Sequence, residues 1–195
     1  MTSRGPLGSF ELYLARHGET EWSLSGRHTG TTDLPLTPNG EAKARSLGDR
    51  LHGLKFDHVY SSPMQRARRT AELAGFPTVE ITPLLKEVDY GRYEGLTSTQ
   101  IHESDPDWEV YKDGCPGGES PAQIYSRANE LIDLATSRGA TRALAFAHGH
   151  ILRAIGVAWI RSAITVAAGL QLDVATLNIL RDGDHGRVIA MWNAP

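Results

Sequence analysis

The sequence predicts an α/β fold: a single-domain three-layer sandwich with a mostly parallel central sheet and helices on both faces. Short apolar runs with strand character alternate along the chain with longer segments of helical spacing, which is typical of parallel strands joined by crossover helices. The chain has 195 residues, of which 40% are hydrophobic, enough for one core of ordinary size. We expect the domain to occupy residues 10–195, behind an N-terminal extension over 1–9.

The first half of the chain supplies strands and two capped helices. Thr37 and Pro38 provide an N-cap and a proline at the first helical position. Ser62-Pro63-Met64-Gln65 matches a capping box, with proline first and glutamine third in the expected helix. The expected elements are a strand at 10–15, a loop at 18–36, a helix at 37–52, a strand at 58–63, a helix from 63 to about 74 and a strand at 78–83.

The second half begins with an irregular aromatic segment and returns to regular elements. Ser120 to Gln123 repeats the capping-box pattern. A continuous apolar run then ends on His148-Gly149-His150, as a buried strand would. The expected elements are an irregular segment at 84–118, a helix from 120 to about 138, a strand from 141, a buried helix at 151–160 and a hairpin over 175–193 that turns at 182–186.

Two of the predicted strands end in the same way. Arg16-His17-Gly18 follows the first strand, and His148-Gly149-His150 follows the later one. Ligands of open α/β sheets bind beyond the carboxyl ends of strands, so these residues are expected to share one cleft. Glycine after each histidine allows a turn and a close approach of ligand. Arg66 lies in the first turn of a helix, where a bound anion would offset its unfavourable interaction with the helix dipole.

This set of side chains suits phosphate. Arginine pairs bidentately with phosphate oxygens, and a neutral imidazole can attack phosphorus and carry the group covalently. The sequence contains no Gly-rich nucleotide loop or acidic metal cluster, which argues against magnesium–nucleotide chemistry.

Charge and composition exclude several other classes. The net charge is −3 and the pI is about 6.2, so a nucleic-acid partner is not expected. No apolar run approaches the ~18 residues of a membrane span. Cys115 is the single cysteine; we expect it to have no role and the protein to be cytoplasmic.

Four motifs in order resemble the histidine phosphatase superfamily, which includes the cofactor-dependent phosphoglycerate mutases. They are "ARHGETEW", "YSSPMQRARRTAE", "LLKEVDYGRYEG" and "AFAHGHILR". The resemblance extends from Phe10 to about Asn193. It implies a phosphoglycerate mutase-like fold and a phosphatase that needs neither a cofactor nor a metal ion.

The resemblance also implies a role for individual residues. His17 is expected to be the nucleophile that becomes phosphohistidine, and Glu87 the proton donor and then the base for water. Arg16, Arg66 and His148 would hold the phosphoryl oxygens. The positions expected to line the substrate pocket are Ser23, where the family has asparagine, Thr29, Gly30, Tyr90 and Gly149.

Two departures favour a phosphatase over a mutase. The mutases carry lysine at the position of Ser98 and paired arginines at Lys112 and Asp113. Those cations grip the carboxylate of phosphoglycerate in the family picture. Other motifs resemble a branch that holds a sedoheptulose-bisphosphatase and an acid phosphatase. The expected substrate is therefore a small phosphorylated metabolite, a sugar phosphate or bisphosphate.

Several alternatives stay open at this point. The protein could be a phosphoglycerate mutase, a protein phosphohistidine phosphatase, or a module that binds a phosphorylated ligand without turnover. His148, His150, His17 and Glu19 could also be drawn as a zinc site. The aromatic stretch from Tyr90 to Tyr111 could form a lid over a small substrate or simply pack in the core. The apolar segment 164–177 could support a homodimer.

Overall fold

The protein forms one six-stranded sheet of mixed direction. The structure, a computed structural model, describes residues 10–137 and 139–195, so the expected extension over 1–9 lies outside the described residues. The strand order is β3-β2-β4-β1-β5-β6, with the first four strands parallel and β5 antiparallel to both of its neighbours. The strands are β1 (Glu11–Arg16), β2 (His58–Ser61), β3 (Glu80–Ile81), β4 (Arg142–Ala147), β5 (Leu177–Gly183) and β6 (Gly186–Ala194).

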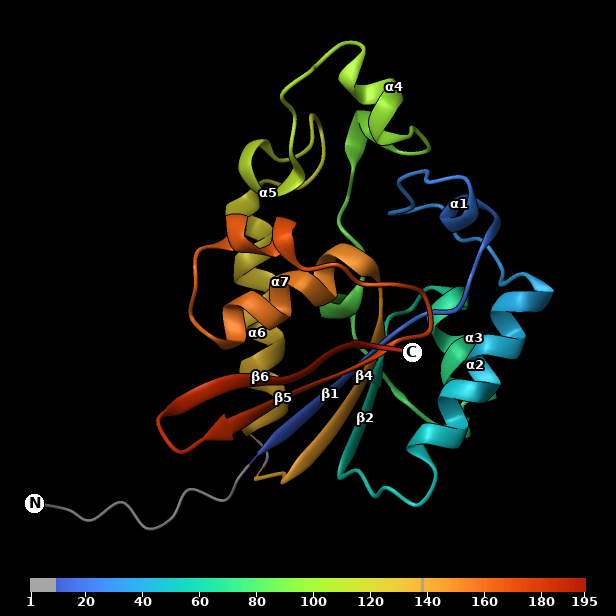
Figure 1. Cartoon of the computed structure of the whole chain (residues 1–195), viewed down its shortest axis with the longest axis vertical. Coiled ribbons are helices and arrows are strands. Elements are labelled where there is room, and N and C mark those ends of the chain that lie inside the picture. Colours follow the sequence, from blue (N-terminus) through green and yellow to red (C-terminus); the bar gives the residue numbers. More distant parts are fainter. Residues whose placement is uncertain (1–9, 138) are drawn as a thin grey trace, which may run out of the picture.

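Helices cover both faces of the sheet (Figure 1). Helices α2 (Pro38–Leu51) and α3 (Gln65–Leu73) pack on one face, and α6 (Pro121–Ser137) and α7 (Gly149–Trp159) on the other. Alternation along β1 divides the core accordingly: Tyr13 packs with α2 and α3, and Leu14 packs with α6 and α7. The predicted three-layer arrangement is confirmed.

Short helices surround the carboxyl ends of the parallel strands. They are α1 (Glu21–Leu24), η1 (Pro83–Leu85), η2 (Gly91–Tyr93), α4 (Ser98–His102), α5 (Val110–Asp113) and η3 (Ile164–Gly169). In Figure 1 the yellow-green segment with α4 and α5 stands above the sheet. Tyr90, Trp108 and Tyr111 of the aromatic stretch are buried in the core.

Most expected elements occur where the sequence predicts them. The N-cap at Thr37 is present, since its side chain accepts a hydrogen bond from the Gly40 amide. The box at Ser120 is also present: Ser120 N–H donates to the Gln123 side chain at 2.9 Å. The predicted loop at 18–36 contains one short helix, α1, and the predicted last residue of α6, Arg138, lies outside the described residues.

The predicted capping box at Ser62 is wrong. Helix α3 begins at Gln65, and its N-cap, Met64, makes no side-chain cap bond. The hydroxyl of Ser62 lies 2.8 Å from His148 Nε2 instead, while Asp33 accepts a hydrogen bond from the Gln65 amide at 2.8 Å. A carboxylate of the chain itself, that of Asp33, therefore lies at this helix start.

Candidate active site

Strand register brings the two histidine motifs together. β1 and β4 are parallel neighbours in which Arg16 pairs with Ala147, so His17 and His148 follow at adjacent positions. The His17 amide continues the ladder by donating to the Ala147 carbonyl at 2.9 Å. The two imidazole centroids are 5.1 Å apart. The two histidine motifs therefore lie side by side, as expected, because the strands that precede them are paired.

His17 is a buried, neutral imidazole with a defined tautomer. Its Nδ1 lies 2.6 Å from the Gly18 carbonyl oxygen. A carbonyl accepts only, so Nδ1 carries the proton and Nε2 keeps its lone pair. Burial, with the nearby Arg16 and Arg66 cations, lowers the pKa of His17 to about 3. At neutral pH this ring therefore has an unprotonated nitrogen that can act as a nucleophile.

Gly18 is required by packing rather than by ligand approach. A Cβ at Gly18 would lie 2.4 Å from the carbonyl oxygen of Gly40 in α2. The turn after His17 is therefore pressed against the start of α2, and no side chain fits between them.

Arg16 offers an unused hydrogen-bond donor beside His17. Its Nη1 donates to the Leu172 carbonyl, which fixes the far end of the guanidinium. Its Nε is buried, and no hydrogen-bond partner for it occurs among the described residues. A buried guanidinium N–H without a partner is costly, and an anion in the adjoining cavity would satisfy it.

Arg66 is fully buried, and its guanidinium donates hydrogen bonds to the 29–32 loop and to His148. Its Nη1 donates to the Thr32 carbonyl at 2.9 Å, and its Nη2 to the carbonyls of Thr29 and Gly30 at 3.0 and 3.2 Å. Its Nε donates to His148 Nδ1 at 3.0 Å. Loop carbonyls and a histidine therefore satisfy this cation in the structure, in the place where the sequence suggested an anion.

The same contact fixes the tautomer of His148. Because Nδ1 accepts from Arg66, Nε2 carries the proton and donates to the Ser62 hydroxyl at 2.8 Å. Burial and the Arg66 charge hold the pKa of His148 well below its ordinary value. His148 is thus a neutral donor locked between β2 and α3.

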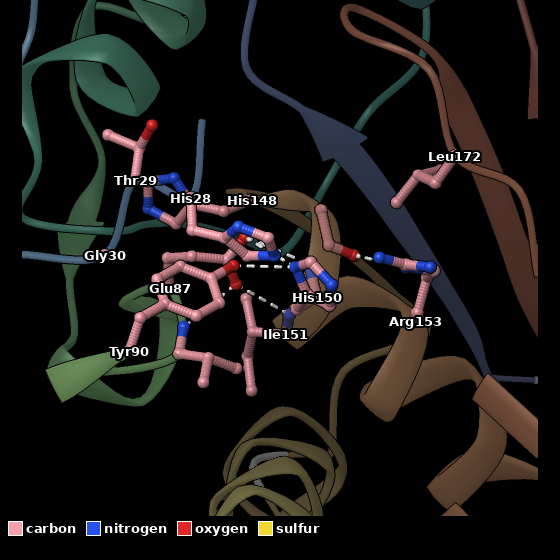
Figure 2. Close-up of polar contacts among 12 residues, drawn as sticks. His28, Thr29, Gly30, Glu87, Tyr90, His148, His150, Ile151, Arg153 and Leu172 are labelled. Atoms are coloured by element: carbon pink, nitrogen blue, oxygen red, sulfur yellow. Dashed lines mark hydrogen bonds and ion pairs between the residues drawn. The ribbon is translucent and has the colours of Figure 1, made fainter. Parts of the chain in front are cut away.

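Glu87 is an ionised carboxylate at the N-terminus of α7. Its Oε1 accepts from the amides of Val88 and Ile151, both at 2.9 Å, and its Oε2 from the His150 amide at 3.0 Å (Figure 2). Burial alone would raise the pKa of Glu87, but the hydrogen bonds that its carboxylate accepts outweigh burial and hold the pKa well below 4.5. The carboxylate is therefore ready to act as a base.

These groups meet at a cavity of about 360 Å³ beyond the carboxyl ends of β1 and β4. It exposes seven of the ten residues expected from the sequence: Arg16, His17, Ser23, Thr29, Glu87, Tyr90 and Gly149. The other three, Arg66, His148 and Gly30, are not among its lining residues.

Three of the expected pocket residues also have local structural roles. Ser23 forms a capping box with Thr20 at the start of α1, in which the Thr20 amide donates to the Ser23 hydroxyl at 2.9 Å. Thr29 donates its hydroxyl to the Arg27 carbonyl at 3.1 Å. Gly30 packs closely, because a Cβ there would lie 2.4 Å from the Val88 carbonyl.

Four cationic or titratable residues of the cavity were not among the expected site residues. They are Arg27, His28, His150 and Arg153. His150 and Arg153 lie within the second histidine motif, on the first turns of α7. Their place in the first turns of a helix that follows a strand-end histidine could have indicated that both side chains lie near the cavity. His28 lies in the irregular loop, where no periodicity marks which side chains point inward.

Glu19 of the metal alternative and Lys112 of the mutase alternative have their partners outside the cavity. Glu19 accepts from the Thr37 hydroxyl at 2.6 Å and from the Asn39 amide at 2.8 Å, which ties it to α2. In the part of the chain that the structure describes, no group of three or more His, Cys, Asp or Glu could hold a metal ion. Lys112 lies 3.7 Å from Asp113 and does not line the cavity, whereas Ser98 does.

The single cysteine and the lengths of the helices can be compared with what the composition predicted. Burial raises the pKa of the Cys115 thiol to about 12, so the thiol stays protonated. None of the described helices is long and apolar enough to cross a bilayer.

Comparisons with known proteins agree with this geometry. The model of the histidine phosphatase superfamily (branch 1) matches residues 12–195. An acid phosphatase of Mycobacterium tuberculosis is 44% identical over 171 residues, covering 86% of this chain and 84% of that protein. Sedoheptulose 1,7-bisphosphatase of Saccharomyces cerevisiae is 34% identical over 178 residues, covering 75% of this chain and 66% of that protein.

Solved structures show the same fold. The product of an open reading frame of Mycobacterium tuberculosis superposes with a TM-score of 0.92 at 40% identity, covering 95% of this chain and 97% of that one. A phosphoserine phosphatase of Entamoeba histolytica superposes with a TM-score of 0.83 at 30% identity, covering 94% and 96%. The four motifs, the site that they build and the family match lead to one conclusion: the chain belongs to the histidine phosphatase superfamily.

Proposed function

We propose that the protein is a phosphomonoester hydrolase that works through a phosphohistidine at His17 and acts on a small phosphorylated metabolite. One observation carries the proposal. A neutral His17, with its Nε2 lone pair free, shares a cavity with an Arg16 Nε that has no partner among the described residues. A nucleophile and an anion-binding donor side by side suit attack on a phosphate ester.

The first half-reaction forms a nitrogen–phosphorus bond. His17 Nε2 attacks phosphorus, and the bond from phosphorus to the ester oxygen breaks. Arg16 stabilises the charge on the phosphoryl oxygens. Glu87 gives the leaving oxygen a proton, for which the carboxyl must first be protonated. A phosphate dianion in the cavity adds negative charge next to Glu87 and so raises its pKa toward that state.

The second half-reaction releases phosphate. Glu87, now ionised, takes a proton from water, and the hydroxide attacks the phosphohistidine. The carboxylate that accepts three amide hydrogen bonds is suited to this step. His17 leaves as the neutral tautomer that the Gly18 carbonyl stabilises.

Arg66 supports these steps chiefly through other groups. It orients His148 and holds the carbonyls of the loop that contains Thr29. This arrangement shapes the wall of the cavity on the side of β2. A phosphoryl group that displaced one of these carbonyls would also find Arg66 as a direct partner.

The cavity favours a small anionic metabolite. Two further cations, Arg27 and Arg153, line it together with His28 and His150. Relatives named for sedoheptulose 1,7-bisphosphate and for phosphoserine act on compounds of this size. We favour a sugar phosphate or bisphosphate. Because Ser98 lines the cavity and Lys112 does not, phosphoglycerate mutase activity is the weaker candidate.

The test traps the intermediate. Wild-type protein is mixed with fructose 1,6-bisphosphate or p-nitrophenyl phosphate, quenched, and examined for a phosphorylated peptide at His17 that is labile in acid. Phosphate release is measured in parallel. His17→Ala is expected to lose both signals, and His185→Ala, at an exposed histidine of the β5–β6 turn, to keep both. Turnover retained in His17→Ala refutes the covalent mechanism.

Three broader expectations belong to the same proposal. We propose that the catalytic domain spans residues 10–195 and that the protein works in the cytoplasm. We also propose a homodimer through the segment 164–177, where Val166 is 46% exposed. Sedimentation equilibrium tests the dimer, and a monomer at micromolar concentration contradicts it.

A further inference from the structure

His150 is a cavity residue that the mechanism above leaves unused. It is the second residue of α7, and its ring Nδ1 lies 2.6 Å from the Tyr90 hydroxyl. The same nitrogen lies 3.8 Å from Glu87 Oε2. Figure 2 shows the three side chains turned toward one another. A titratable ring thus stands directly beside the carboxylate that must gain and lose a proton.

The surroundings hold His150 in this place. The Tyr111 hydroxyl donates to the His150 carbonyl at 2.8 Å, and the His150 amide donates to Glu87. The His28 ring stacks on the His150 ring at 5.9 Å.

The charged and titratable groups that face the ring come from each element packed against it. They are Glu87 and Tyr90 from the segment after η1, Tyr111 from α5, His28 from the loop after α1, and Arg153 from α7 itself. Of these, only Glu87 carries negative charge at neutral pH. A proton placed on the ring is therefore attracted to that carboxylate.

The reaction requires a proton on Glu87, which is ionised in the structure. Glu87 is ionised, since three amides hold its carboxylate. His17 and His148 are both neutral, and their N–H groups are already committed to Gly18 and Ser62. The His150 ring lies 3.8 Å from Glu87 Oε2, and it borders the cavity.

We propose that His150 is the proton partner of Glu87. When a phosphate dianion enters, the ring takes up a proton from solvent at Nδ1. An inward shift of about 1 Å brings Nδ1 within hydrogen-bond distance of Oε2. The Nδ1–H bond then breaks and an O–H bond forms on Glu87, which leaves a neutral imidazole. Glu87 passes this proton to the leaving oxygen, later takes one from water, and returns it to His150.

Electrostatics agree with this sequence. Burial and Arg153 lower the pKa of His150 to about 4 against the opposing effect of Glu87, so the free enzyme keeps the ring neutral. A bound dianion supplies the missing negative charge and moves the pKa upward. Because His150 acts through Glu87, it is a positioning residue and makes no bond to the substrate.

The inference rests on the proposed hydrolase function, and rapid-mix kinetics test it. The variant is His150→Asn, which keeps the backbone amide and removes the titratable ring. The rate of His17 phosphorylation is measured from about pH 5 to 9 with fructose 1,6-bisphosphate and with p-nitrophenyl phosphate. The sugar ester needs a proton to leave, and nitrophenolate leaves almost unaided.

We expect a selective effect. With the sugar ester at pH 7.5, the phosphorylation rate of His150→Asn falls at least about tenfold, and its alkaline decline moves to lower pH by about one unit. With the aryl ester the burst rate changes less than about threefold. His28→Asn, a neighbouring cavity histidine, is the matched control and is expected to affect both esters alike.

Other outcomes overturn the inference. Equal slowing of both esters in His150→Asn, or an unchanged alkaline decline, shows that the ring is only structural. Thermal unfolding verifies that the variant is folded, and His150→Gln serves for the same comparison if it is not. If the wild-type enzyme forms no phosphohistidine, the proposed function fails first, and the two failures are therefore distinguishable.

Discussion

Replacing Glu87 by glutamine separates the role of its charge from that of its shape. In the native site Oε1 accepts from the Val88 and Ile151 amides, and Oε2 accepts from the His150 amide. Glutamine can retain the first two bonds through its single oxygen. Its NH₂ group would then face the His150 N–H, so two donors oppose each other where one charged hydrogen bond existed.

The expected loss of stability follows from the one charged hydrogen bond that Glu87→Gln removes. Loss of one hydrogen bond to a charged group costs about 1.5–3 kcal/mol. For a domain of this size each kcal/mol lowers Tm by roughly 2–4 °C. We therefore expect Tm of Glu87→Gln to fall by about 3–12 °C at pH 7, measured by differential scanning calorimetry.

The difference in Tm between wild type and Glu87→Gln is expected to depend on pH in one direction. Since the folded-state pKa of Glu87 is held well below 4.5, its contribution to stability is complete above pH 4.5 and is lost as pH falls through the folded value. The Tm difference between wild type and Glu87→Gln should thus shrink on acidification below pH 4.5. A difference that is absent at pH 7, or constant down to pH 3, would refute the ionised carboxylate described here.

Kinetics of the same variant test the acid role. Phosphorylation by fructose 1,6-bisphosphate should slow by a factor of about 10²–10⁴, and phosphorylation by p-nitrophenyl phosphate much less. Glu19→Gln is the control, because Glu19 is a buried carboxylate that contacts Thr37 and Asn39 outside the cavity. It should affect stability and leave the ratio of the two rates unchanged. If both rates fall equally in Glu87→Gln, Glu87 is not the proton donor.

Four further predictions concern other parts of the site. Arg66→Ala leaves three carbonyls and His148 without their donor, so the free energy of unfolding should fall by at least about 3 kcal/mol in urea titrations; a loss under about 1 kcal/mol contradicts the buried network. Because the pKa of His17 is about 3, its phosphorylation by p-nitrophenyl phosphate should change little between pH 7 and 5; a tenfold fall centred near pH 6.5 would assign the ring an ordinary pKa. Gly30→Ala places a Cβ 2.4 Å from a backbone oxygen, so stability should fall by about 1–3 kcal/mol, and an unchanged Tm contradicts the close packing. Activity should survive EDTA, because His17 and Arg16 supply what a metal ion supplies elsewhere; loss that Zn²⁺ or Mg²⁺ restores contradicts this mechanism.

The sequence predicted the fold well because strand and helix signals are local. The apolar alternation of 10–15 and the caps at Thr37 and Ser120 each act within a few residues. The prediction failed at Ser62, where the competing partner, His148, is 86 residues away. Local pattern cannot show that a hydroxyl is already committed to a distant side chain.

The site was predictable in part for the same reason. Two histidines at strand ends pointed to a shared cleft, and the family resemblance supplied Glu87, which no local pattern distinguishes from a surface carboxylate. The partners of Arg66 were not predictable, since they are backbone carbonyls of an irregular loop. His28 was missed because its inward direction depends on the Leu96 carbonyl, 68 residues further along the chain.

The contacts of Arg66 also constrain how the protein folds. They join residues 34, 37 and 82 positions apart in the chain, so the network closes only after long loops have been ordered. A fragment of residues 10–140 contains His17, Arg66 and Glu87 but neither β4 nor α7. Such a fragment lacks the strand that pairs with β1 before His17 and two of the three amides that hold Glu87, those of His150 and Ile151. Assembly of the site thus depends on contacts between distant parts of the chain, and we expect activity to recover during refolding only after these contacts have formed.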